Sequence, residues 1–146
     1  MHKIFGIKED AEYLDRKGVY LIPIKNDSVG VIQTSKGFFL LGGGLDTGET
    51  DVSCIKRECM EEAGYTVSIK YKIGSAEMYC KIPKIGYFHP IQTYYVGELL
   101  EKVQTPIEDD HTLVWFKFSD LRGKMSLEMQ NWALEAALKL ILSVRN

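Results

Sequence analysis

The chain has 146 residues, of which 45% are hydrophobic and 26% are charged, and its formal net charge is −2. This length and composition are typical of a globular domain with a hydrophobic core. The slightly acidic balance gives no electrostatic reason to expect a nucleic-acid polymer as a partner. No apolar run approaches the roughly 20 residues of a membrane-spanning helix. We therefore expect one cytoplasmic domain over residues 1–146 without a membrane partner.

The predicted elements alternate between strands and two helices. Alternating apolar residues between turn signals predict strands at 18–25, 29–34, 37–41, 66–79, 86–99 and 112–118, the second and third forming a hairpin. Helical spacing predicts helices at about 50–63 and 127–144. Pro83, Gly86 and Pro90 interrupt the middle strands and favour a bulge or loop there. Elements in this order favour a mixed β-sheet between helices, an α/β/α sandwich.

Both predicted helices have an apolar stripe and a possible cap. Thr50 can cap the first helix, and Gly64 is a usual stop for its carboxyl end. Ser126 is the candidate cap of the second helix. The apolar positions expected to face the core are Val52, Ile55, Cys59 and Ala63 in the first helix, and Met129, Trp132, Ala136, Leu140 and Val144 in the second.

Three glutamates share another face of the first helix. At about 100° per residue, Glu58, Glu61 and Glu62 fall within about 100° of arc, as i, i+3 and i+4 neighbours. Like charges this close repel each other, and a divalent cation between them would explain their presence. Oxygen ligands point to a hard cation such as Mg²⁺, or Mn²⁺ in its place. The pattern therefore predicts a metal-binding helix.

A glycine-rich segment containing Gly42, Gly43, Gly44 and Gly48 precedes this helix. Together the two segments read Gly43-x5-Glu49-x7-Arg57-Glu58-Cys59-x-Glu61-Glu62-x-Gly64-Tyr65. This spacing resembles the signature of the Nudix hydrolases at every polar and glycine position. The chain departs from the family pattern at Cys59, where an aliphatic residue is usual, and at Leu41, where a proline is common. Neither departure removes a catalytic group.

The resemblance implies a Nudix-type α/β/α sandwich and a function. Such an enzyme hydrolyses a phosphoanhydride bond, with Mg²⁺, in a nucleoside diphosphate linked to another group. Glu58 and Glu62 would be the main metal ligands, with Glu61 completing the site and the carbonyl of Gly43 as a further ligand. In the family, a residue at the place of Arg57 orients a catalytic carboxylate and pairs with one at the place of Glu49. By the residues alone, Arg57 could instead form a surface pair with Glu61.

The general base is open at this stage. Relatives often use a glutamate three residues before a tryptophan, and here that position is Thr112, before Trp115. The loop just before it offers replacements, and the candidates are Glu108, Asp109 and Asp110, with His111 and Glu61 as alternatives. A solvated acidic loop would give the same sequence, so the motif does not choose among them.

The substrate is expected to be a small-molecule nucleotide. A short chain without further motifs most resembles the hydrolases of nucleoside triphosphates or dinucleoside polyphosphates, acting as a monomer or homodimer. The alternatives are a non-catalytic nucleotide sensor and an isopentenyl diphosphate isomerase on a related fold. His89, among several aromatic residues, could contact a ligand or belong to the packing. Cys54, Cys59 and Cys80 lack the spacing of a disulfide framework or zinc site, so we expect them to be free.

Overall fold

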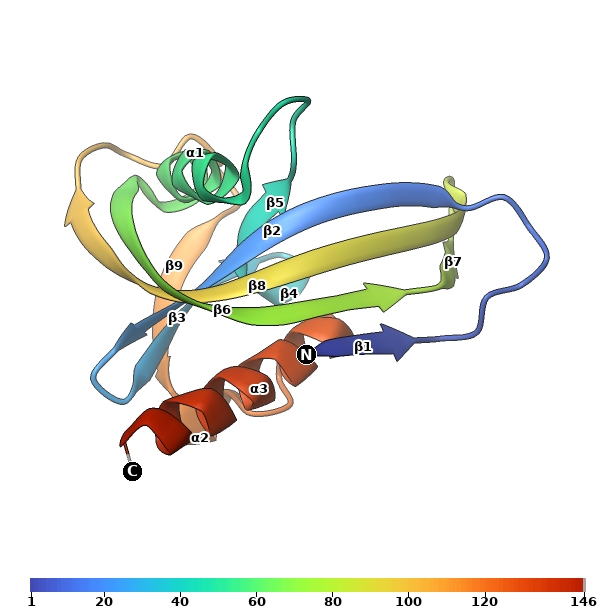
Figure 1. The fold of residues 1–146 in the computed structure, drawn as a ribbon. Helices are drawn as coiled ribbons and strands as arrows, with labels where there is room; N and C mark the ends of the chain where they lie inside the picture. Colours follow the sequence, from blue (N-terminus) through green and yellow to red (C-terminus); the bar gives the residue numbers. More distant parts are fainter. Residues whose placement is uncertain (146) are drawn as a thin grey trace.

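The computed structural model describes residues 1–145 and is shown in Figure 1. In chain order the elements are β1 (His2–Phe5), β2 (Leu14–Lys25), β3 (Ser28–Thr34), β4 (Gly37–Phe39), β5 (Leu41–Gly44), α1 (Asp51–Ala63), β6 (Tyr65–Met78), β7 (Cys80–Ile82), β8 (Gly86–Lys102), β9 (Thr112–Lys117), α2 (Phe118–Leu121) and α3 (Glu128–Arg145). Among these residues, no helix is long and apolar enough to cross a membrane.

The strands form a mixed sheet in which β2 occupies the central place. The path through the sheet runs β1-β6-β8-β2-β3-β4, with β5 paired to β2, β7 to β8 and β9 to β3. Strand β2 is parallel to β8 and antiparallel to β5. Only its last two residues, Ile24 and Lys25, pair with β3. Because β2 changes partners along its length, it joins the part of the sheet under α1 to the β3-β4-β9 part.

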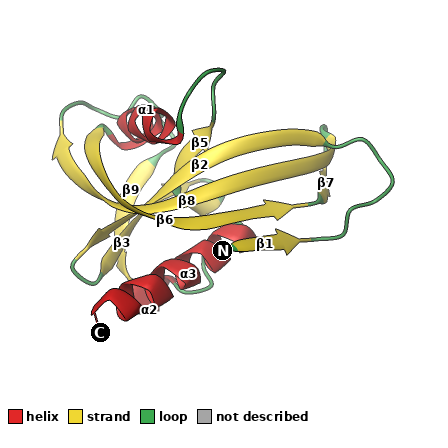
Figure 2. Ribbon diagram, viewed as in Figure 1, coloured by secondary structure: helices red, strands yellow, loops and turns green. Residues whose placement is uncertain are grey.

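The two longer helices cover opposite faces of the sheet (Figures 1 and 2). Successive residues of a strand point to opposite faces, and β2 supplies both layers. Val19 and Leu21 belong to the core cluster that contains the buried residues of α1. Ile22 belongs to the second cluster, which contains those of α3. The mixed α/β sandwich predicted from the sequence is confirmed.

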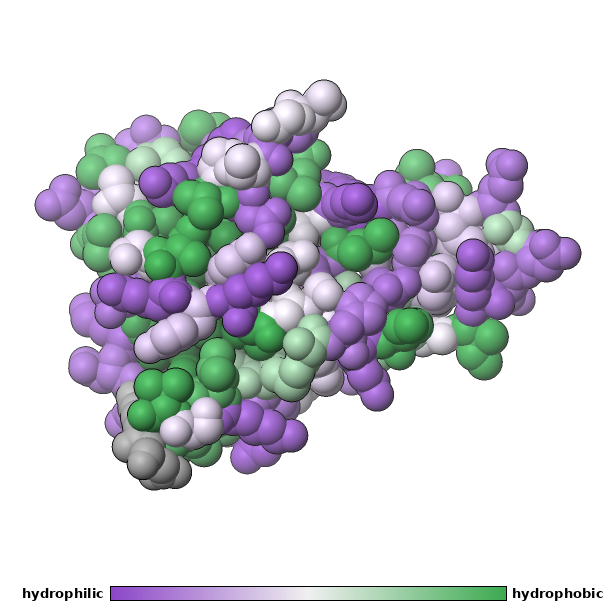
Figure 3. Space-filling model, in the orientation of Figure 1, coloured by the Kyte–Doolittle hydropathy of each residue, from purple (hydrophilic) through white to green (hydrophobic). Residues whose placement is uncertain are grey.

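The core lies on both sides of the sheet, and the surface is mixed. On the face shown in Figure 3, hydrophobic residues appear in separate groups among hydrophilic ones. The β-strand extension that carries β7 projects from the body of the molecule (Figure 1). Pro90 lies within β8, opposite Arg16 of β2, and not in a loop. The expected interruption is instead the turn before Gly86.

The predicted elements differ from the observed ones mainly in the strands. The predicted strand 37–41 is divided into β4 and β5, and β5 continues through the glycine-rich segment because Leu41 to Gly44 pair with residues 18–21 of β2. The elements β1, β7 and α2 were not predicted. Phe118, expected at the end of a strand, begins α2. These pairings join positions far apart in sequence, which local periodicity does not report.

Helix α1 has the predicted ends. The Thr50 side chain accepts a hydrogen bond from the Ser53 backbone N–H, and the Thr50 backbone N–H donates one to the Ser53 hydroxyl, forming a capping box. Gly64 ends the helix in the left-handed conformation, with φ 75°. Val52 was wrongly assigned to the buried stripe, since its exposed fraction is 45% whereas Ile55 is fully buried. The helical angle alone does not show how far the sheet extends beneath the first turn.

Helix α3 begins later than expected. Its first residue is Glu128, and the Ser126 hydroxyl, the candidate cap, donates a hydrogen bond to the carbonyl oxygen of Lys36 at 3.1 Å. The predicted core face is confirmed at Met129, which is fully buried. At the other end, Val144 is 59% exposed, so its assignment to the core was wrong. The helix there has passed the edge of the sheet that it covers (Figure 1).

The end of α1 gives a test of stability. A Cβ added at Gly64 would lie 2.0 Å from the carbonyl oxygen of Gln104, whereas at Gly123, with a similar φ of 72°, it would meet nothing within 4 Å. Both Gly→Ala changes should cost roughly 1 kcal/mol of unfolding free energy for the left-handed conformation. Gly64→Ala should cost about 1–3 kcal/mol more because of the clash. Urea denaturation measures both, and equal losses would contradict the close packing at Gly64.

Candidate active site

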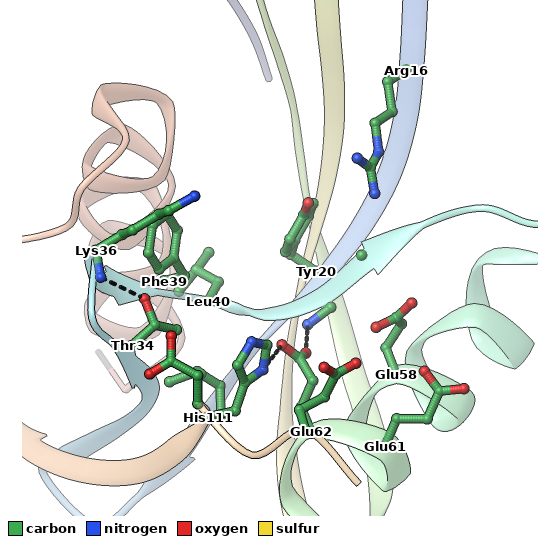
Figure 4. Close-up of a pocket in the computed structure, with 15 residues that line it drawn as sticks. Arg16, Tyr20, Thr34, Lys36, Phe39, Leu40, Glu58, Glu61, Glu62 and His111 are labelled. Atoms are coloured by element: carbon green, nitrogen blue, oxygen red, sulfur yellow. Dashed lines mark hydrogen bonds and ion pairs between the residues drawn. The ribbon is translucent and has the colours of Figure 1, made fainter. Parts of the chain in front are cut away.

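A cavity of about 480 Å³ lies beside the carboxyl-terminal half of α1 (Figure 4). Four parts of the chain meet there: α1, the glycines of β5, strand β2 with the β3–β4 hairpin, and the loop before β9. The residues that line the cavity include Glu58, Glu61, Glu62, Gly42, Gly43, Arg16, Tyr20, Lys36, Glu108, Asp110 and His111. The structure therefore gathers the three glutamates predicted on one helical face at a single cavity.

Arg57 joins the loop to the helix. Its Nε and Nη2 donate to the two carboxylate oxygens of Glu49 at 2.7 and 2.9 Å, and Nη2 also donates to the carbonyl oxygen of Gly44 at 3.1 Å. Its Nη1 donates to Glu58 at 2.9 Å and to Glu61 at 3.3 Å. The hydrogen bonds from Arg57 lower the pKa of Glu49 to about 2. The expected pair with Glu49 is present, and so is the i, i+4 pair with Glu61.

Glu62 is a buried carboxylate, with an exposed fraction of 6%. The backbone N–H of Gly42 donates to its Oε1 at 2.8 Å. Burial raises the pKa of Glu62 to about 8, and the nearby charges of Glu58 and Glu108 add to this rise. Burial also raises the pKa of Glu58, which the hydrogen bond from Arg57 opposes. The unfavourable cost of charging these acids is what a bound cation would offset.

His111 faces Glu62 from the loop before β9 (Figure 4). Its Nδ1 lies 3.1 Å from Oε2 of Glu62. The contact lacks hydrogen-bond alignment, so this buried nitrogen has no hydrogen-bond partner among the described residues. A buried polar atom without a partner usually marks a functional position or a missing ligand. His111 thus belongs to the site, as one of the alternatives to the acidic base candidates.

Gly43 is required for a reason that the motif did not reveal. A Cβ at this position would lie 2.6 Å from the carboxylate carbon of Glu58. Any side chain would therefore displace Glu58 from the cavity wall. The carbonyl oxygen of Gly43 lies 3.7 Å from Sγ of Cys54, a weak contact. Its assignment as a metal ligand stays a prediction.

The structure separates the candidate bases. The backbone N–H of Ile107 donates to the carbonyl oxygen of Glu61 at 2.8 Å and so fixes the loop against α1. Glu108 lines the cavity, whereas Asp109 does not. Asp110 lines it too, but its carboxylate accepts hydrogen bonds from Ser35, the closest at 2.9 Å from the hydroxyl. Glu108 is the acid left free to act at the cavity.

Two cations at the cavity were missed by the sequence reasoning. Arg16 of β2 and Lys36 of the β3–β4 turn both line it, on either side of Tyr20 (Figure 4). Neither side chain forms a salt bridge with any described residue. Their positions in the sequence carry no motif, because each reaches the cavity only through the folding of its strand. Positive groups left unpaired beside carboxylates fit a polyanionic ligand with bound cations.

The carboxylates fit Mg²⁺ or Mn²⁺ better than a softer ion. Within the described residues, no group of three or more His, Cys, Asp or Glu side chains is arranged so that it could hold a metal ion. Mg²⁺ does not need one, since it is usually bound through one or two carboxylates, with water and substrate oxygens completing six ligands. Glu58 and Glu62, one helical turn apart at the same cavity, supply such a donor set. Gly43, which leaves space beside Glu58, agrees with it.

His89 lies away from this cavity and has a packing role. Its ring nitrogens contact Asp15 at 2.8 Å and Glu77 at 3.0 Å, and its ring stacks on Tyr79 with 4.3 Å between centroids. The packing interpretation is the one that the structure supports. All three cysteines are free, as expected. Cys59 is fully buried, which agrees with its assignment to the core face of α1.

The burial of Glu62 predicts a pH dependence of stability in the metal-free protein. A carboxyl whose pKa is raised on folding is stabilising only while protonated, so stability is lost as the pH rises from about 4.5 towards 8. Glu62→Gln keeps an acceptor for Gly42 and removes this loss. With chelator present, the variant should gain stability over the unsubstituted protein, on the order of a few kcal/mol, between pH 5 and 9. Urea denaturation measures the gain, and the more exposed Glu61, changed to Gln, is the control. A gain that does not vary with pH would contradict a buried, protonated Glu62.

Comparison with solved structures supports the fold. A NUDIX hydrolase from Nitrosomonas europaea superposes with a TM-score of 0.69 and 17% identity, over 85% of this chain and 90% of that chain. A MutT NUDIX hydrolase from Burkholderia pseudomallei gives a TM-score of 0.71 and 19% identity, over 84% of this chain and 98% of the other. No curated protein matches the sequence.

A family model, the NUDIX domain, matches residues 15–137. The match includes β2, the glycine strand, α1 and the loop before β9, and therefore every side chain assigned to the cavity above. The chain belongs to the NUDIX family and is an enzyme of the Nudix hydrolase class.

Proposed function

We propose that residues 1–146 act as one Nudix hydrolase domain that uses Mg²⁺ or Mn²⁺ to cleave a phosphoanhydride bond in a nucleoside diphosphate linked to another group. Nucleoside triphosphates and dinucleoside polyphosphates are the favoured substrates. The observation that supports this proposal is the cavity in which the α1 carboxylates lie near Arg16 and Lys36, two cations without a salt bridge to any described residue. A polyphosphate with bound divalent cations has the complementary charges. We expect the enzyme to act in the cytoplasm as a monomer or homodimer.

Glu58 and Glu62 would hold the metal, with Glu61 and the carbonyl of Gly43 as further ligands. When bound, the ion polarises a phosphoryl oxygen and lowers the pKa of coordinated water. Arg57 positions these acids, because it binds Glu49 through both carboxylate oxygens and Glu58 through a third nitrogen. The loop and helix are thereby held in one arrangement before substrate binds, which is the kind of preorganisation that catalysis requires.

Arg16 and Lys36 would bind the phosphate oxygens. Phosphate recognition by these residue types is common, Arg through paired donors and Lys as a point charge. Glu108 would take the proton of the attacking water, since it lines the cavity and its carboxylate has no hydrogen bond from a described residue. The Ile107 contact to α1 holds this acid near Glu61. Asp110 would hold the loop in place by accepting a hydrogen bond from the Ser35 hydroxyl. His111 would position Glu62, which its ring contacts.

The metal assignment predicts loss of hydrolysis in Glu58→Gln and Glu62→Gln. Each change keeps the shape of the side chain and removes a charge, so divalent-metal-dependent turnover should fall by about 10³-fold or more, the scale of losing a main electrostatic contribution. Release of phosphate and pyrophosphate from a nucleotide panel measures the rate. Glu101→Gln, at an exposed position, is the matched control. Full turnover in a folded Glu58→Gln protein would contradict the assignment of Glu58 as a metal ligand. Nucleotide binding without turnover in the unsubstituted protein would favour a nucleotide sensor.

The base assignment predicts a different pattern. Glu108→Gln should lower kcat by about 10²–10⁴-fold, as expected for loss of a general base. Asp109→Asn is a sharp control, because the neighbouring acid lies outside the cavity lining and should retain its rate. Metal titration should show nearly unchanged affinity in both variants. If Glu108→Gln retains its rate while His111→Gln loses it, the imidazole is the base.

A further inference from the structure

A second cavity, of about 330 Å³, adjoins the first. The two share Arg16, Tyr20 and Phe39. The new volume falls within the range of about 300–1,000 Å³ found for small-molecule sites. Its walls are mostly apolar, and the side chains that supply them are Met78, Ile82, Phe88, Pro90 and Leu127. A molecule bound in the carboxylate cavity can therefore extend past Arg16 into an apolar one.

Gln92 is a buried polar side chain in the wall of this second cavity, with an exposed fraction of 5%. It lies on β8 directly opposite Gly18 of β2, which also lines the cavity. A Cβ at Gly18 would lie 2.9 Å from the Tyr20 ring, so this glycine lets Tyr20 pack beside the cavity. A buried amide needs partners for both its oxygen and its nitrogen.

A chain of hydrogen bonds fixes the orientation of this amide. The backbone N–H of Leu40 donates to Oε1 of Gln130 at 2.9 Å, and a backbone N–H can only donate. The Nε2 of Gln130 therefore points the other way and donates to Oε1 of Gln92 at 3.1 Å. The Tyr94 hydroxyl donates to the same oxygen at 2.9 Å. The Oε1 atom of Gln92 thus accepts two hydrogen bonds within the protein, and the NH₂ group of the same amide is left to donate elsewhere.

Within the described part of the chain, Nε2 of Gln92 has no hydrogen-bond partner. Among the described residues, the only completely buried side-chain nitrogen or oxygen without a hydrogen-bond partner is Nδ1 of His111. Nε2 of Gln92 is therefore not completely buried. Two donor hydrogens therefore face a largely apolar cavity that Arg16 also lines. A donor left unpaired in such a place costs free energy until a ligand supplies an acceptor.

Building on the proposed function, we propose that the second cavity is the specificity subsite for the base of the nucleoside diphosphate, and that Gln92 donates a hydrogen bond to a carbonyl oxygen of that planar ring. Tyr20, Phe39 and Phe88 provide aromatic surface against which a flat heterocycle packs. The bases that carry a carbonyl group, which are guanine, cytosine, uracil and thymine, satisfy both requirements, whereas adenine does not. A hydrocarbon chain would fill the volume but leave the amide without an acceptor.

The test compares binding of guanosine, uridine and adenosine monophosphates to the full-length protein by calorimetry. The unsubstituted protein should bind at least one carbonyl-bearing base about tenfold more tightly than adenosine, the worth of one good hydrogen bond. Gln92→Leu should reduce this ratio to about one by weakening the favoured ligand. Gln92→Glu, which replaces the donor by an acceptor, should reverse the ratio.

Gln130→Glu tests the orienting chain without touching the ligand. The carboxylate would still accept from Leu40 but could no longer donate to Gln92, so the Gln92 amide should turn over and present its oxygen to the cavity. The base preference should then shift in the same direction as in Gln92→Glu. A packing role for Gln130 would weaken all ligands equally and leave the ratio unchanged. Gln104→Glu, at an exposed site, is the control.

Three results would overturn the proposal: equal affinity for all bases in the unsubstituted protein, an unchanged ratio in both Gln92 variants, or tighter binding of a prenyl diphosphate than of every nucleotide. If Gln130→Glu does not fold, the two Gln92 variants decide alone. Binding does not require turnover, so a protein that shows the base preference but hydrolyses nothing would contradict the proposed function and support this subsite.

Discussion

Repulsion among the carboxylates of α1 is the constraint around which this site is built. Glu58, Glu61 and Glu62 share one helical face, and burial makes the charging of Glu58 and Glu62 still less favourable. Arg57 offsets part of this repulsion through its ion pairs with Glu58 and Glu61. Glu62 accepts a hydrogen bond from the Gly42 N–H and lies beside the His111 ring. The remaining negative charge is available for a divalent cation. A fold that tolerates this arrangement needs stability from elsewhere, and both faces of the sheet are packed with apolar residues.

The same contacts explain the glycine strand. Arg57 reaches the carbonyl oxygen of Gly44, Glu62 reaches the N–H of Gly42, and Glu58 lies where a side chain of residue 43 would be. A Cβ at Gly42 would lie 2.2 Å from the carbonyl oxygen of Val19 and one at Gly44 would lie 3.2 Å from the Arg16 guanidinium, so each glycine has its own reason to lack a side chain. Pairing of β5 with β2 holds this backbone in place. The glycines are therefore part of a rigid wall of the cavity, in addition to giving the chain freedom to turn.

Two adjoining cavities of different character share a boundary at Arg16, Tyr20 and Phe39. One is lined by carboxylates and cations, and the other is largely apolar. This division suits a substrate with a polyphosphate at one end and a ring at the other. The two cavities also draw on different parts of the chain, since the proposed catalytic residues lie on α1 and in the loop before β9, whereas the apolar cavity is formed mainly by β2, β7 and β8.

The sequence by itself determined the parts that depend on neighbours along the chain. Helical periodicity placed the three glutamates on one face, local capping chemistry set the ends of α1 at Thr50 and Gly64, and the motif supplied the pairing of Arg57 with Glu49. Only the tertiary structure showed that the glycines form a strand, that Val52 is exposed and that Glu108 rather than Asp109 lines the cavity. The orientation of Gln92 depends on Leu40 and Gln130, positions far apart in sequence. Such contacts come from strand pairing and helix packing, which no local pattern of residues encodes.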